Sequence, residues 1–160
     1  MKKTQIRCIV GNAIVHIASI LILCFYVLNM VEGVGGNSIY SAITNLSTAT
    51  GADIAYYIVA GAFYILTLIL AITMIILSAI GLFGGIFDIR ALNMTTANRT
   101  LSILAMISAL MSLIFMIVYV SLAGIAGSSV GAGPITVFLA SILAVVGAFV
   151  AYSRKIYRSE

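Results

Sequence analysis

Three polar residues inside the first apolar run are the best candidates for chemistry in this sequence. The run from residue 8 to residue 30 carries no charge, yet it contains the only histidine of the chain. The three residues are Asn12, His16 and Ser19, and at 3.6 residues per turn they fall on one helical face. They either form hydrogen bonds between helices, which is the interpretation we favour, or form a site for a ligand, a proton or a cofactor.

The side chains that an enzyme or an ion-coupled transporter would use do not occur together in this sequence. A hydrolase needs a nucleophile, a base and an orienting acid, but the four acidic residues lie near the ends of apolar runs or at the C-terminus. No carboxylate lies inside an apolar run, where a proton or sodium gradient would be coupled. We therefore expect a non-enzymatic protein without a metal or a cofactor. A cofactor-binding subunit, with His16 as one ligand and another chain supplying the second, is a distant alternative.

The composition indicates a membrane protein. The 160 residues are 63% hydrophobic and only 8% charged, whereas soluble domains carry about 25% charged residues. The formal net charge is +4, but the basic residues flank apolar runs and form no basic face, so we expect no nucleic-acid partner. The expected partner is the lipid bilayer, with the cell (plasma) membrane as the expected location.

Four uncharged runs are long enough to cross a bilayer, which needs about 20 helical residues. They are continuous rather than alternating, which favours helices over barrel strands. The predicted fold class is therefore all-α and integral to the membrane, as one domain of four transmembrane helices. The predicted spans are residues 8–30, 54–83, 101–126 and 134–152.

The basic residues predict the orientation of these spans. Every lysine and arginine precedes the first span, lies between the second and third, or follows the fourth. Four spans bring these segments to one side, which the positive-inside rule makes cytoplasmic. Both termini are therefore predicted to be cytoplasmic.

The two outer loops leave alternatives open. In the first, residues 31–53, apolar residues recur at helical spacing over residues 38–47, which fits either a short interfacial helix or an irregular loop. The second is rich in glycine, which suits a tight connection better than a pore loop that exposes carbonyl groups to an ion.

Small and polar residues at alternating spacings of three and four predict where the helices touch. Helices in lipid associate through close packing of small residues and through polar contacts, and the seven-residue period of these positions predicts a left-handed bundle. The predicted packing residues include Gly81, Gly85, Ser112 and Ala144.

Two functions fit this pattern. The favoured one is a structural or interaction subunit of a homo-oligomeric or hetero-oligomeric membrane assembly. The alternative is an oligomeric pore or passive facilitator, but the serines of the third span are interrupted by isoleucine and methionine. The layout resembles claudin or tetraspanin topology, yet the chain has no tryptophan and no cysteine in an outer loop, so no family is assigned.

The orientation can be tested by labelling cysteines on intact cells. In a chain with Cys8 and Cys24 replaced by serine, we expect Ser41→Cys and Ser129→Cys to react with an impermeant maleimide and Thr96→Cys to be protected. Labelling at position 96 with protection at position 41 would reverse the predicted orientation.

Overall fold

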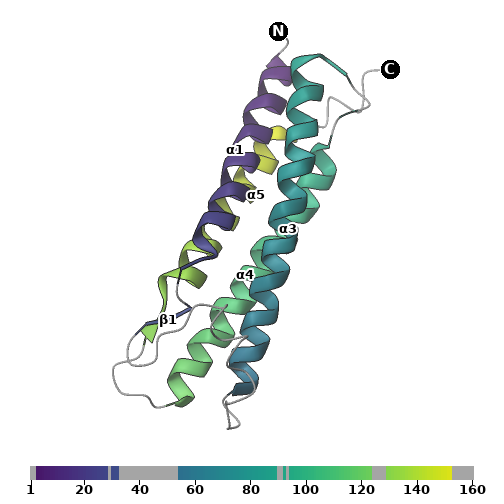
Figure 1. Ribbon diagram of the computed structural model, residues 1–160. Coiled ribbons are helices and arrows are strands. Elements are labelled where there is room, and N and C mark those ends of the chain that lie inside the picture. Colours follow the sequence, from purple (N-terminus) through teal and green to yellow (C-terminus); the bar gives the residue numbers. More distant parts are fainter. Residues whose placement is uncertain are drawn as a thin grey trace.

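A computed structural model of the chain is a bundle of four long helices (Figure 1). It describes residues 3–28, 30–32, 54–89, 92, 94–123 and 129–152, so the predicted interfacial helix at 38–47 lies outside the described residues. The helices are α1 (Lys3–Phe25), α3 (Ile54–Ile86), α4 (Thr95–Ala123) and α5 (Ala132–Ala151). Each of the four is long and apolar enough to cross a membrane, as the sequence predicts.

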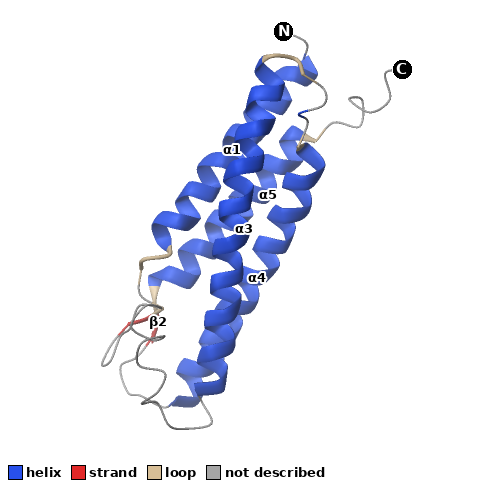
Figure 2. Cartoon of the chain, turned by 45° about the vertical axis from the view of Figure 1, so that its right-hand side comes forward, coloured by secondary structure: helices blue, strands red, loops and turns tan. Residues whose placement is uncertain are grey.

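The helices form a ring in the order α1, α3, α4, α5. Each packs against its two neighbours in this ring, whereas α1 and α4 lie diagonally opposite and scarcely touch. Figures 1 and 2 show that α1 begins and α5 ends at the same end of the bundle, which we call the terminal end. The turn between α3 and α4 also lies at the terminal end.

A small sheet, which hydropathy does not reveal, lies towards the opposite end of the bundle. Strand β1 (Val31–Glu32) pairs antiparallel with β2 (Ser129–Val130), with Val31 opposite Val130. The amide of Gly131 donates to the carbonyl of Met30 over 2.7 Å, and Met30 is fully buried. We call this the strand end. It ties the segment after α1 to the segment before α5.

Three helix boundaries lie five or more residues from the limits of the predicted spans, and the first is the start of α1 at Lys3 rather than at residue 8. Helix α1 ends at Phe25 rather than near residue 30, because the apolar residues beyond it enter the turn and β1 instead. Helix α4 begins at Thr95 rather than at residue 101. Its first turns contain threonine, asparagine and arginine, so a hydropathy threshold places the start of the helix too late.

Helix α3 stays helical through its glycines and ends in a left-handed cap. Asp88 has a φ of 54°, and the amide of Ile89 donates to the carbonyl of Gly84 over 2.9 Å. This is the long hydrogen bond of a Schellman motif, which satisfies a carbonyl that the helix end would otherwise leave open. The cap directs the chain back towards α4.

Glycines allow the helices to approach closely at the terminal end. A Cβ on Gly81 would lie 2.9 Å from the amide atoms of Asn12, and one on Gly85 would lie 2.8 Å from Cγ1 of Ile9. A Cβ on Gly11 would overlap the backbone of Ala151. Gly81 and Gly85 therefore form the contact between α1 and α3 within one chain.

The other two predicted packing residues also lie at contacts within the chain. Ser112 is fully buried and its hydroxyl donates to the carbonyl of Ala60 on α3 over 2.9 Å. Ala144 of α5 is fully buried in the apolar core.

The glycine contacts predict two substitutions with different outcomes. Gly11→Ala should lower the thermal unfolding midpoint in detergent, because the new methyl group meets the rigid backbone of α5, and overpacking costs about 1–3 kcal/mol. Gly85→Ala would bring the new methyl group 2.8 Å from Cγ1 of Ile9, with the nearest backbone atom of Ile9 3.7 Å away, and alanine gains about 1 kcal/mol of helix propensity over glycine.

Gly85→Ala should therefore lower the midpoint by less than Gly11→Ala does, because a side chain rather than the backbone of α5 has to shift. Equal losses in the two variants would mean that the contact between Gly11 and Ala151 is looser than described here.

Candidate functional site

A fully buried polar contact joins two asparagines from diagonally opposite helices. The side-chain amide of Asn98 on α4 donates to Oδ1 of Asn12 on α1 over 2.8 Å. Both residues are fully buried. Nδ2 of Asn12 donates in turn to the carbonyl of Cys8 over 3.0 Å, one turn earlier in α1. The amide of Asn12 thus uses both its donor and its acceptor inside the chain.

Gly81 makes room for this contact. A Cβ at position 81 would project onto the side-chain amide of Asn12. Helix α3 can therefore lie against the polar end of Asn12 while Asn98 reaches it from α4 on the other side. Three of the four helices meet at this one side chain.

His16 is held by a second polar contact, between α1 and α3. Its Nδ1 lies 2.9 Å from the hydroxyl oxygen of Ser78, which also lies 3.1 Å from the carbonyl of Ile75. A hydroxyl has one proton. When Ser78 donates that proton to the carbonyl of Ile75, the hydrogen bond between His16 and Ser78 must use a proton on Nδ1 of His16. Nε2 of His16 is then left as an acceptor.

Ser19 is buried but takes no part in a contact between helices. Its hydroxyl donates to the carbonyl of Val15 over 2.8 Å, within α1. The structure therefore places Asn12, His16 and Ser19 on inward or partly inward positions of α1, and gives each a hydrogen bond. They do not converge on one shared partner.

Serine hydroxyls join α3 and α4 nearer the strand end. Ser108 donates to the carbonyl of Phe63 over 2.8 Å, and Ser112 donates to that of Ala60, one turn away. The phenol of Tyr64 donates to the carbonyl of Phe25 at the end of α1 over 3.3 Å. These hydroxyls are used on backbone carbonyls and do not line a free polar surface.

The chemistry available to the polar cluster is limited. Among the described residues, no three histidine, cysteine or acidic side chains come together as metal ligands would. Ser78 is fully buried, so the pair of Ser78 and His16 has a nucleophilic hydroxyl that no substrate can reach. One atom retains unused capacity, because Oδ1 of Asn98 is buried without a hydrogen-bond partner.

Sequence reasoning missed Asn98 and did not connect Ser78 with His16. Asn98 lies before the predicted start of the third span, in a stretch interpreted as a loop. Its spacing gives a signal, since it precedes Ser102 by four residues and continues the small-residue period of α4. Ser78 shares the helical spacing of Gly81 and Gly85, but nothing in the sequence shows that it faces His16.

Comparison of the chain with protein-family models, with curated proteins and with solved structures gives no match.

The contact between the asparagines predicts a particular pattern in a double-mutant cycle. Asn98→Ala alone should destabilise the bundle, because Oδ1 of Asn12 loses its donor while it stays buried. Asn12→Leu with Asn98→Leu should cost less than the sum of the single leucine variants, since no polar partner is left behind. The coupling energy should be about 0.6–2 kcal/mol.

Unfolding in detergent, followed by helical circular dichroism, measures this coupling. Ser121→Ala is the matched control, because that hydroxyl is exposed and bonds only within α4, so its removal should have little effect. Strict additivity of the two asparagine substitutions would contradict an energetic contact between them.

Proposed function

We propose that the protein is a non-enzymatic membrane protein that serves as a structural or interaction subunit of a membrane assembly. In this proposal the four helices span the cell membrane as a left-handed bundle, with both termini cytoplasmic. The observation that carries it is the use of the inward polar groups. Asn12 and His16 form hydrogen bonds to α4 and α3, and Ser19 forms one within α1, so these polar groups are used inside the chain rather than left for a substrate.

The outward faces support a membrane location and an interaction role. Large apolar side chains are exposed on all four helices, for example Ile17, Ile69, Leu104 and Leu139. Soluble monomers rarely expose contiguous apolar patches of more than a few hundred Å². Lipid tails or the helices of other subunits are the natural cover for such faces.

The polar contacts support the absence of a catalytic role. Ser108 and Ser112 are occupied by carbonyls of α3, and Ser78 is occupied by His16 and Ile75. A hydroxyl that holds two helices together is poorly placed to attack a substrate. These polar contacts between helices lie within one chain, so association with other chains would use the outward apolar faces.

A passive facilitator is the second candidate, and one observation favours it. The asparagine contact places amide groups at the centre of the bundle, with one buried acceptor still unpartnered. Against it, Ile22, Met74 and Met116 are fully buried in the same core. These side chains interrupt the polar path within one copy.

Mass and flux measurements on the same preparation separate the two candidates. After extraction into nanodiscs under mild conditions, an assembly subunit should run as a complex heavier than the 16.9 kDa chain, and liposomes that contain it should leak no faster than empty ones. A single copy that accelerates the flux of water or small solutes would replace the assembly proposal with the facilitator.

Substitutions of His16 test whether its polar contact holds α1 against α3. His16→Gln keeps a hydrogen-bonding group opposite Ser78 and removes the imidazole. It should preserve the mass of the complex and its thermal midpoint. His16→Leu should lower the thermal midpoint, because Ser78 keeps only the carbonyl of Ile75 and the polar contact between α1 and α3 is lost. A thermal midpoint unaffected by His16→Leu would contradict the packing role.

A further inference from the structure

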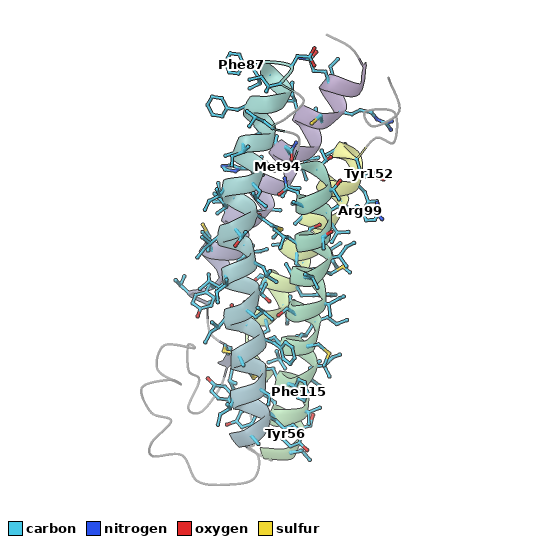
Figure 3. The ribbon with its side chains drawn as sticks, turned by 90° about the vertical axis from the view of Figure 1, so that its right-hand side faces the viewer. Tyr56, Phe87, Met94, Arg99, Phe115 and Tyr152 are labelled. Atoms are coloured by element: carbon cyan, nitrogen blue, oxygen red, sulfur yellow. The ribbon has the colours of Figure 1, made fainter. Side chains whose placement is uncertain are left out.

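The guanidinium of Arg99 lies over two aromatic rings at the terminal end. Its central carbon lies 4.9 Å from the centre of the Phe149 ring and 4.7 Å from that of Tyr152. Figure 3 shows Arg99 and Tyr152 together at the edge of the bundle rather than in its interior. Both distances fall within the range of a cation–π contact. The two rings therefore restrict the position of the guanidinium.

The donors of this guanidinium are not used by the described part of the chain. No carboxylate there forms an ion pair with Arg99, and no described residue accepts a hydrogen bond from its side chain. An arginine has five N–H donors in a fixed fork that matches the oxygens of a phosphate. In the described part of the chain these donors therefore stay available for such a ligand.

The position of Arg99 fits the headgroup region of a bilayer. Phe149 is 50% exposed on the outward face of α5, so the guanidinium lies on a ring that faces the surroundings of the bundle. Tyrosines and arginines are typical of the membrane interface, where the ring is buried and the charge meets the headgroups. In the sequence, Arg154, Lys155 and Arg158 follow Tyr152 closely.

We propose that Arg99, held by Phe149 and Tyr152, binds the phosphodiester of an anionic phospholipid between the ends of α4 and α5. The guanidinium donates to the phosphate oxygens, and Phe149 contacts the start of the acyl chains. The inference rests on the membrane insertion in the proposed function, but it does not depend on assembly with other subunits.

A purely structural role for Arg99 makes a different prediction. Helix α5 ends at Ala151, and a cation beside the negative end of a helix is stabilising. If Arg99 served only to fasten α4 to α5, its loss would lower thermal stability without changing the affinity for any lipid. The two roles are therefore separated by a lipid titration.

The test is native mass spectrometry of the purified full chain, titrated with phosphatidylglycerol or with phosphatidylcholine. The wild type should bind phosphatidylglycerol more tightly than phosphatidylcholine. Arg99→Gln should weaken phosphatidylglycerol binding about fivefold, and Arg99→Lys should weaken it less, because it keeps the charge and loses the fork. Arg7→Gln is the matched control, since Arg7 is an exposed arginine of α1 near the same end, and it should bind like the wild type.

Three results would overturn the proposal. Equal losses in Arg99→Gln and Arg7→Gln would mean that only the overall charge attracts the lipid. An unchanged affinity in Arg99→Gln with a lower thermal midpoint would assign Arg99 to fastening α4 and α5. Displacement of phosphatidylglycerol by millimolar inorganic phosphate would assign the site to the free ion.

The premise of insertion is tested separately by carbonate extraction of membranes. A wild type that remains in the membrane but shows no lipid preference dependent on Arg99 refutes this inference alone. A wild type that is washed off refutes the insertion in the proposed function as well.

Discussion

The hydrogen bond from Asn98 to Asn12 joins α1 and α4, one of the two diagonal pairs of helices in the ring. Four helices whose outward faces are apolar have little water near their inward polar groups, and an unsatisfied polar group in such surroundings costs several kcal/mol. The amide of Asn12 therefore needs a partner, and Asn98 on the diagonal helix α4 supplies it. This requirement fixes the rotation of α1 and α4 about their axes, because both side chains must point to the centre at the same height.

The neighbouring features follow from that requirement. Helix α3 can approach the pair only where it has no side chain, which is at Gly81. With α3 at that distance, Ser78 lies one turn away against His16, and Gly85 exposes a carbonyl that accepts a hydrogen bond from Gln5 over 2.8 Å. Small residues and polar residues thus act together, since close approach is what brings the polar partners within hydrogen-bonding distance.

The sequence predicts the four apolar helices because length and hydropathy are properties of each segment alone. The same local reasoning places Asn12, His16 and Ser19 on one face of α1 and identifies Gly81 as a contact. It does not identify Asn98 as the partner of Asn12, because a contact between diagonal helices depends on the order of all four. It also does not reveal the pairing of Val31 with Val130, since two short segments so far apart in the chain carry no local signal of their register.

The most direct test of this account is a measurement of the two side-chain amides by NMR in nanodiscs. The account predicts a strong nuclear Overhauser effect between the Asn98 side-chain NH₂ and the side chain of Asn12, with Asn98 amide protons that exchange slowly with water. Rapid exchange of both side-chain amides without any mutual Overhauser effect would contradict it, and would mean that water rather than the opposite helix satisfies these groups.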